Sequence, residues 1–305
     1  MPVVVVGPLA FDDVRTPAEE RIGLLGGSGA YASIAAAKLA PTALVSVAGD
    51  DLTDQDLGPL VAAGVDVGGI ERRPGRTLRW SGTYDATTQK SEVRNTDLGV
   101  VAGWRPRIPR AWLNTPYVLL ANTDPAAQAV ALEQLRPALA VLDTMEEWIA
   151  GHRRGLDDVI AGVGVVAVNE RELAALTRGK GALELLARGP RAVIVKRGGD
   201  GATLVTKAGS LIVPAYPADA FDPTGAGDAL AGAFTARLAA LGRADEPALR
   251  DALAHGMAAA SFAVGSFSVW ALTRATREEI ETRARWLGAR ARLGTDQPAR
   301  LYEGR

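Results

Sequence analysis

The segment Asp222–Phe234, DPTGAGDALAGAF, decides how the rest of the chain is interpreted. Two glycines flank Ala226, Asp228 follows, and an alanine-rich helical pattern continues to about Leu241. A helix that begins inside a glycine turn presents unpaired backbone N–H groups and a positive dipole end, which favour an anion. An acid beside an anion-binding turn suits phosphoryl transfer to a hydroxyl group. The alternative is a glycine-rich helix cap without any chemistry.

Around this segment, short apolar runs alternate with longer helical patterns. The runs are rich in Val, Ile and Leu, which is typical of strands covered on both faces: Val3–Val6, Ala43–Val47, Tyr117–Ala121, Ala138–Leu142, Val163–Val168 and Ala192–Val195. Helices are predicted between them: Ser28–Leu39, Asp54–Ala63, Pro125–Leu135, Glu170–Leu176 and Gly181–Ala187. The alternation predicts an α/β fold with a doubly wound, mainly parallel sheet flanked by helices.

Two regions depart from this alternation. Three helices are predicted in the C-terminal third: Ala226–Leu241, Pro247–Val264 and Arg277–Arg290. Residues 76–101 lack helical periodicity and are expected to form extended strands joined by a polar turn near Asp85–Lys90. We therefore expect one α/β domain over residues 1–305, with a small β lid at about residues 70–102. A plain surface hairpin is the alternative for the second region.

Composition excludes several classes of function. The chain has 305 residues, with 34 basic and 35 acidic side chains, so no overall field attracts nucleic acid. It has no cysteine, and its two histidines, His152 and His255, lie far apart, which excludes thiol chemistry and a multi-histidine zinc site. The sequence shows neither a signal-peptide pattern nor an apolar run long enough for a membrane span, so a cytoplasmic location is expected.

Residues 222–228 resemble the C-terminal signature of the ribokinase-like (PfkB) family of carbohydrate and nucleoside kinases. The family pattern is Asp-Thr-x-Gly-Ala-Gly-Asp, and this chain has Pro223-Thr224 in place of Thr-x. The resemblance implies a ribokinase-like fold and ATP-dependent transfer of the γ-phosphate to a hydroxyl of a sugar or sugar-like molecule. It also implies that Asp228 is the general base. The turn made by Gly225, Ala226 and Gly227 would stabilise charge on the phosphate.

The acceptor site is expected near the N-terminus. Gly26, Gly27 and Ser28 open a segment that resembles the family's Gly-Gly-x-x-x-Asn signature beside the sugar, but Tyr31 stands where the family has Asn. Asp12 matches a family Asp five residues after Gly7, and follows the first strand, where ligands of open α/β sheets bind.

Two further residues are assigned to the acceptor with an alternative beside each. Asp13 is either a second acceptor of hydroxyl hydrogen bonds or a solvated neighbour. Trp80, in the expected lid, either covers a sugar face or stacks on a nucleobase, while Trp80, Tyr84 and Trp104 can equally form the lid's own core.

The nucleotide site is expected in the second half. Asn169 and Glu172 match the family's Asn-x-x-Glu motif, which implies that Glu172 helps to hold the water shell of Mg²⁺. A capped helix start is the alternative. The remaining nucleotide-binding candidates are Lys196, Gly198, Gly201, Thr224 and His255. Lys196 can reach a phosphate as a point charge, or can be a solvated residue at a strand end.

Departures from the family pattern leave other functions possible. Many relatives have Asp-x-Asn-x-Arg where this chain has Asp143, Met145 and Glu147, so a phosphate-binding Arg is missing there. The alternatives are a nucleoside kinase of the same fold and a catalytically silent sugar- or nucleotide-binding protein. Activation by a monovalent cation is left open, and dimerisation through the lid is suggested only by family analogy.

The glycines at the start of the first predicted helix also fit a dinucleotide-binding pattern. Gly27–Ala32 fits G-x-G-x-x-A, with Asp50 and Asp51 about 20 residues on. The glycines do not follow the first strand directly, however, so an NAD-dependent oxidoreductase is disfavoured.

Overall fold

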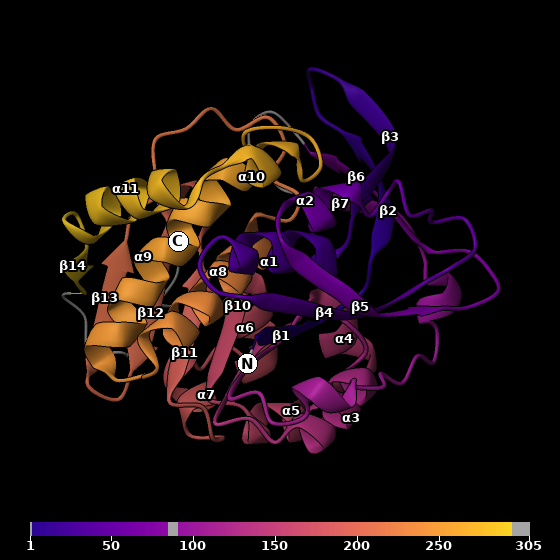
Figure 1. Cartoon of the computed structure of the whole chain (residues 1–305). Helices are drawn as coiled ribbons and strands as arrows, with labels where there is room; N and C mark the ends of the chain where they lie inside the picture. The colour runs from indigo at the N-terminus through magenta and orange to yellow at the C-terminus, as the bar shows by residue number, and fades with distance from the viewer. Residues whose placement is uncertain (1, 85–90, 295–305) are drawn as a thin grey trace.

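A ten-stranded sheet forms the centre of the molecule (Figure 1). The structure is a computed structural model, and it describes residues 2–84 and 91–294. Seven neighbouring strands are parallel, in the order β11 (Ala192–Lys196), β10 (Val165–Asn169), β9 (Leu139–Asp143), β8 (Tyr117–Leu120), β1 (Val3–Val6), β4 (Thr42–Ala48) and β5 (Val65–Arg72). Antiparallel strands extend the β11 edge: β12 (Ala202–Thr206), β13 (Gly209–Val213) and β14 (Arg292–Leu293).

Helices cover both faces of this sheet. One face carries α1 (Ser28–Ala37), α2 (Gly58–Ala62), α8 (Ala226–Leu241), α9 (Glu246–Ala263), α10 (Trp270–Arg274) and α11 (Arg277–Gly288). The other face carries α3 (Pro125–Leu135), α4 (Glu146–Gly151), α5 (Arg153–Gly162), α6 (Glu170–Thr177) and α7 (Ala182–Leu186). The predicted doubly wound arrangement is therefore what the structure shows.

The alternation of side chains along β1 explains why the sheet needs two helical layers. Val3 and Val5 belong to the core under the first layer, whereas Val4 and Val6 belong to the core under the second. Successive side chains of a strand point to opposite faces, so a run of four valines is apolar on both. Each face must then be covered by an amphipathic helix layer.

Glycines bring α1 and α8 into the position that builds the site. A Cβ on Gly29 would lie 2.5 Å from the carbonyl oxygen of Gly7, so α1 can begin directly over the end of β1. A Cβ on Gly232 would lie 2.1 Å from the carbonyl oxygen of Ala32, so α8 packs backbone to backbone against α1. The first turns of both helices consequently lie next to each other.

The lid is a separate four-stranded sheet, in the order β3 (Glu20–Gly26), β2 (Ala10–Arg15), β6 (Leu78–Tyr84) and β7 (Ser91–Asp97). Strands β6 and β7 were predicted, whereas β2 and β3 were missed because Asp13, Arg15 and Glu19–Arg21 make that stretch polar. A lid strand has one solvated face, so it lacks the continuous apolar run of a buried strand. The predicted polar turn at residues 85–90 lies outside the described residues.

Other elements differ from their predictions. The helix expected over 54–63 is confined to α2, and β5, β12, β13, α4 and α5 were not anticipated. β5 contains Gly68 and Gly69 among charged residues, and β12 and β13 are short antiparallel strands rather than members of a βαβ unit. The three C-terminal helices begin and end within two residues of their expected positions.

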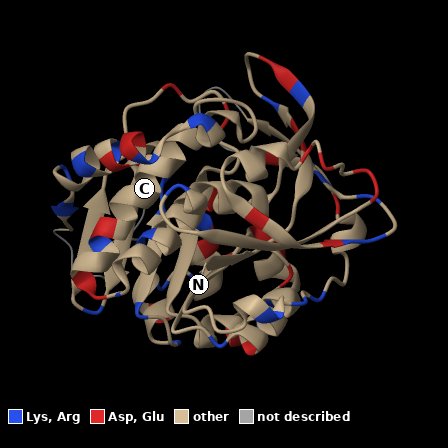
Figure 2. Cartoon of the chain, in the orientation of Figure 1, with Lys and Arg blue, Asp and Glu red and all other residues tan. Residues whose placement is uncertain are grey.

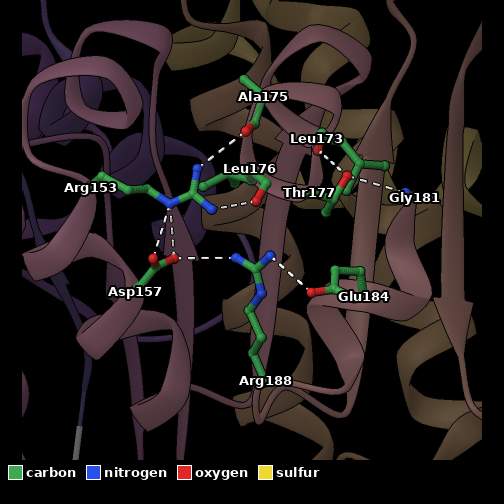
Figure 3. A network of polar contacts seen from close by, with 9 residues as sticks. All are labelled: Arg153, Asp157, Leu173, Ala175, Leu176, Thr177, Gly181, Glu184 and Arg188. Carbon is green, nitrogen blue, oxygen red and sulfur yellow. Dashed lines mark hydrogen bonds and ion pairs between the residues drawn. The ribbon is translucent and has the colours of Figure 1, made fainter. Parts of the chain in front are cut away.

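A polar network fixes the end of α6 that lies away from the sheet's ligand-binding edge (Figure 3). Arg153 on α5 donates to the carbonyls of Ala175 and Leu176 in the last turn of α6, and pairs with Asp157. Arg188 joins Asp157 to Glu184 on α7. The carbonyls at a helix C-terminus lack intrahelical partners, so this network holds α6 in place, with Asn169 and Glu172 at its opposite end.

Charges of both signs are interspersed over the helices and loops in the view of Figure 2, consistent with the net charge of −1. Among the described residues, none of the helices combines the length and apolar composition that crossing a bilayer needs.

Candidate active site

A cavity of about 820 Å³ lies where the carboxyl ends of the parallel strands meet the small sheet. The large domain contributes Gly27, Asn122, Asn169, Glu172, Thr224, Gly225 and Asp228 to its lining, and the lid contributes Asp12, Trp80, Tyr84 and Glu92. Open α/β sheets bind their ligands at this edge. The cavity therefore unites the first and second halves of the sequence-predicted site.

The turn before α8 is open toward the cavity. Gly225 is the N-cap residue with φ 73°, and it lacks a side chain that could cap the helix. The Ala226 amide donates weakly to the carbonyl of Pro223, 3.3 Å away, so it is partly engaged. The amides of Gly227 and Asp228 have no backbone acceptor within the part of the chain that the structure describes. The Asp228 amide donates to its own carboxylate, and an N–H group without a backbone acceptor at the start of a 16-residue helix favours an anion at this point.

Tyr31 supports this turn from below. A Cβ on Gly225 would lie within 2.3 Å of three ring carbons of Tyr31, and Tyr31 is only 1% exposed. Glycine is required here for two reasons: the positive φ angle and the contact with the ring. Tyr31 borders the cavity, but its buried ring supports the catalytic turn, a role that its assignment to the acceptor did not anticipate.

Asp228 belongs to a buried charged cluster. Lys196 forms an ion pair with Asp143, with 2.7 Å between Nζ and Oδ1, and Nζ lies 3.1 Å from the position of a Cβ on Gly227. Burial, together with the charges of Asp143 and Glu172, raises the pKa of Asp228 to about 7, while Lys196 opposes the rise. The Lys196 side chain is 16% exposed and paired with Asp143, so it is not a freely solvated residue at a strand end, while its contact with a phosphate stays a prediction.

Glu172 and Asn169 form the predicted helix start. The Asn169 side chain accepts from the Glu172 amide (2.8 Å), and Glu172 Oε2 accepts from the Asn169 amide (2.7 Å). This capping box is the capped helix start that the sequence offered as the alternative to a magnesium-binding role. Both residues also line the cavity, so the cap does not exclude that role. Burial raises the pKa of Glu172 to about 7.

The carboxylates of this cluster fit a divalent cation held through water. Asp143, Glu172 and Asp228 surround the single ammonium of Lys196, which leaves an excess of negative charge. The described residues contain no group of three His, Cys, Asp or Glu side chains close enough to bind a metal directly. Mg²⁺ keeps several of its waters in such sites, so both observations are consistent with it.

Asp12 also lines the cavity, on β2 of the lid sheet. A Cβ on Gly26 would lie 1.8 Å from its Oδ2, so only glycine leaves room for this carboxylate. Burial raises the pKa of Asp12 to about 8, although a hydrogen bond from the Gly27 amide opposes the rise. Gly27, with φ 84°, is the N-cap residue of α1, and Ser28 donates to the carbonyl of Asn122. These residues hold a buried carboxyl group at the cavity wall, and its contact with the acceptor stays a prediction.

The lid aromatics have different positions. Trp80 lines the cavity and packs against Val14, Leu24 and Phe267, so it is both a wall and part of the lid core. Trp104 is only 1% exposed and belongs to the core of the main sheet. The Tyr84 hydroxyl lies 3.0 Å from Thr224 Oγ1, which ties the lid to the turn before α8.

Eight candidate residues lie outside the cavity lining: Asp13, Gly26, Lys196, Gly198, Gly201, Ala226, Gly227 and His255. Asp13 accepts a hydrogen bond from the Gly23 amide (2.7 Å), which supports the alternative of a local role. Gly198 and Gly201 bound a short turn after β11, with φ angles of 55° and 94°. His255 is buried in α9, where its Nδ1 lies 2.8 Å from the Asp251 carbonyl. Their nucleotide contacts stay predictions.

The dinucleotide alternative is inconsistent with this geometry. The strand before Gly27 is β3, which belongs to the small sheet. Asp51 accepts from the Thr77 amide and pairs with Arg79 at 3.0 Å, so it braces the base of the lid and is not free for a ribose.

Sequence reasoning missed one side of the cavity. Asn122 and Thr123 follow β8, and Trp148 and His152 lie on or next to α4. The rule that identified Asp12, polar residues directly after a buried strand, also identifies Asn122 and Thr123.

Comparison with known proteins identifies the family. A model described as "pfkB family carbohydrate kinase" matches residues 23–273. The chain belongs to this family. The predicted enzyme class, a phosphotransferase with an alcohol group as acceptor, is thereby confirmed, as is the ATP-dependent kinase reading.

Individual relatives of this pfkB family member differ in their acceptors. A cytidine kinase of Thermococcus kodakarensis is 28% identical over 246 residues, which cover 77% of this chain and 87% of the relative. An ATP-dependent ribose-1-phosphate kinase of Halopiger xanaduensis is 31% identical over 217 residues, which cover 69% and 72%.

The fold is that of solved ribokinases. A putative ribokinase II from E. coli in its apo form has a TM-score of 0.76 at 22% identity, with 93% of this chain and 99% of that chain covered. The same protein in complex with ATP and Mg²⁺ has a TM-score of 0.74. The predicted ribokinase-like fold with a separate small sheet is thus confirmed.

Proposed function

We propose that this protein transfers the γ-phosphate of ATP to a hydroxyl group of a sugar or a nucleoside-type molecule in the cavity, with Asp228 as the general base. The single observation that carries the proposal is the geometry of the α8 turn. Asp228 and the amide-lined turn of Gly225–Asp228 border the same cavity as Asp12, the expected acceptor ligand.

The contribution of Asp228 depends more on its position than on its basicity. Its carboxylate accepts the proton from the acceptor hydroxyl as the new P–O bond forms, and a loose transition state requires little proton removal early on. A pKa of about 7 means that a large fraction of Asp228 is ionised at neutral pH. In this proposal, the amides of Gly227 and Asp228 and the ammonium of Lys196 face the charge that develops on the phosphate, which the open amides and the closeness of Lys196 to Gly227 support.

Mg²⁺ is proposed as the cation that accompanies ATP here. When bound, it neutralises phosphate charge and orients the nucleotide. Glu172 would hold it through water, since its carboxylate lies in the cavity next to an uncompensated negative charge. Asn169 fixes the orientation of Glu172 through the capping box.

Asp12 would bind and orient the acceptor. Its pKa of about 8 keeps the carboxyl group largely protonated at neutral pH in the free protein, so it can donate one hydrogen bond and accept others. The Trp80 side of the lid excludes water from the same space, which protects ATP from hydrolysis.

A monovalent cation is proposed next to Asp222. The Oδ2 atom of Asp222 is buried without a hydrogen-bond partner in the described part of the chain. The backbone amides of Phe221 and Asp222 both donate to the carbonyl of Val264. Burial raises the pKa of Asp222. We expect higher activity in K⁺ than in tetramethylammonium, and the same activity in both salts for Asp222→Asn.

The test of the function is acceptor-dependent release of ADP from Mg-ATP. Sugars, sugar phosphates, inositols and nucleosides are screened, and the phosphorylated product is identified by mass. At least one acceptor should stimulate ADP release well above the hydrolysis background. Tight binding of an acceptor without any ATP consumption would instead identify a catalytically silent binding protein. The cytoplasmic location and the dimer through the lid stay predictions.

A further inference from the structure

Part of the cavity lining comes from α4 and from the loops that follow β8 and β9. We define the α4 arm by Asn122, Thr123, Met145, Glu147 and Trp148, all of which line the cavity. Asn122 and Thr123 follow the end of β8, while the other three come from the loop after β9 and the first turn of α4. Met145 and Glu147 are the two residues that depart from the family's Asp-x-Asn-x-Arg pattern.

The arm is part of an acidic lining. Six acidic side chains border the cavity, of which Asp12 is largely protonated at neutral pH: Asp12, Glu92, Glu146, Glu147, Glu172 and Asp228. Within the described lining, Arg171 is the only lysine or arginine, and its guanidinium is bound to Glu146 at 3.1 Å. Glu147 is exposed toward solvent and has no ion pair among the described residues. A second phosphate group, carried by the acceptor, would find carboxylates here and no free cation.

The arm also holds polar atoms that lack a protein partner. Asn122 Oδ1, Thr123 Oγ1 and Trp148 Nε1 are buried and have no hydrogen-bond partner in the described chain. Thr123 is only 2% exposed. Asn122 Nδ2 contacts only the weak acceptor Sδ of Met145, at 2.9 Å. Buried polar groups are normally satisfied, so a ligand with both donors and acceptors fits this set.

An aromatic pair closes the arm. The rings of Trp148 and His152 pack edge to face, with 5.2 Å between their centroids. An apolar wall beside unpaired donors and acceptors suits a flat ring with amide or amino groups.

We propose that the α4 arm selects the acceptor: it binds a neutral or cationic ring substituent with amide or amino groups, as a nucleobase has, and excludes acceptors that carry a phosphate. This inference rests on the proposed function, because the substituent belongs to the molecule whose hydroxyl meets Asp228. Of the two acceptor types named for the curated relatives, it favours a nucleoside over a sugar phosphate.

The test compares cytidine, ribose and ribose 1-phosphate, in kcat/KM with Mg-ATP and in equilibrium binding by calorimetry without ATP. The wild-type protein should prefer cytidine to ribose 1-phosphate by at least about tenfold in both measurements. Glu147→Arg should raise the relative affinity for ribose 1-phosphate by about tenfold and leave that for ribose unchanged. The control Glu133→Arg makes the same charge change on an exposed position of α3, outside the cavity lining, and should leave the ratio as it is.

Thr123→Val and Trp148→Phe test the polar part of the arm: the first removes an unpaired hydroxyl with little change in shape, and the second removes the indole N–H together with part of the ring. Both should lower the affinity for cytidine about tenfold without an effect on ribose. A wild-type preference for ribose 1-phosphate, or equal effects of Glu147→Arg and Glu133→Arg, would overturn the proposal. If no acceptor consumes ATP, the proposed function fails, but the binding ratios still decide whether the α4 arm selects in this way.

Discussion

At the scale of single residues, the pKa values in the site depend on the small number of cationic side chains near its carboxylates. Lys196 is the ammonium that compensates Asp143, Glu172 and Asp228, and its pKa is raised by these acids. The pKa of Asp228 is therefore a balance: burial, Asp143 and Glu172 raise it, and Lys196 lowers it. The direction of each contribution can be tested by removing its source.

We expect the rate to fall on the acid side of a midpoint near pH 7. The base must be ionised, and kcat/KM for ATP reports the free enzyme, in which the pKa of Asp228 is about 7. Activity is thus present above this pH and is lost as the pH decreases through it. Because the pKa of Glu172 is also about 7, the midpoint of the pH profile reflects the titration of Asp228 and Glu172 together.

Two variants should move this midpoint in opposite directions. Lys196→Met removes the opposing charge and raises the pKa of Asp228, so the midpoint moves to higher pH. Asp143→Asn removes a neighbouring negative charge and moves it to lower pH. Lys207→Met, at an exposed turn, is the control for lysine removal. Identical pH profiles for all four proteins would show that this cluster does not control the base.

The residues of the site were predictable to different degrees. Some site residues follow strands or begin helices, so local sequence patterns identify them without an alignment: Asp12, Asn169, Glu172 and Asp228. Tyr31 was placed in the site, but its role under Gly225 was not, because that contact joins two residues 194 positions apart through the packing of α1 against α8. Burial that shifts a pKa is likewise a property of the assembled fold.

At the scale of elements, the turn into α8 is the most constrained. Gly225 combines φ 73° with the Tyr31 ring at 2.2 Å from any added Cβ, so a side chain there must displace either the ring or the turn. The helices that carry the chemistry were predicted well, because α1, α6 and α8 begin at glycine or capping signals. The lid strands β2 and β3 were missed, because half-solvated polar strands resemble loops.

Gly225→Ala should lower kcat by about 10², since a displacement of the amides by about 1 Å has an effect of this size. Gly242→Ala is the matched control: it also replaces a glycine of positive φ, 65°, at the other end of α8, where nothing lies within 4 Å of the new Cβ. It should lower the melting temperature without a comparable loss of kcat. Equal kcat for the two variants would contradict the role of the turn. Steady-state kinetics and thermal melts measure both.

At the scale of the whole molecule, two sheets share one cavity. The lid contacts the large domain through the Thr224–Tyr84 hydrogen bond and through Phe267, which packs against Val14 and Leu24 of the lid. Thr224 belongs to the catalytic turn, so the position of the lid and the geometry of the turn are connected. Chain order alone predicted a lid, but not that β2 and β3 would join β6 and β7 in one sheet.

Tyr84→Phe should weaken the coupling between ATP consumption and acceptor phosphorylation. Without the hydroxyl, the lid loses its polar tie to Thr224, and water enters the cavity more easily. The ratio of ADP released to product formed should increase severalfold over the wild-type value. Tyr117→Phe, a tyrosine outside the cavity lining, serves as the control. An unchanged ratio in Tyr84→Phe would show that the hydrogen bond between the lid and Thr224 does not help to exclude water.

The most direct measurement is the turnover of Asp228→Asn, together with its affinity for ATP. Asparagine has the same shape as aspartate but cannot accept the hydroxyl proton as a carboxylate does, and the backbone amides of the α8 turn remain in place. The account predicts that kcat decreases by a factor of about 10² or more while the Kd for ATP changes little. A variant that retains wild-type turnover would remove Asp228 from the mechanism and with it the proposed chemistry of this site.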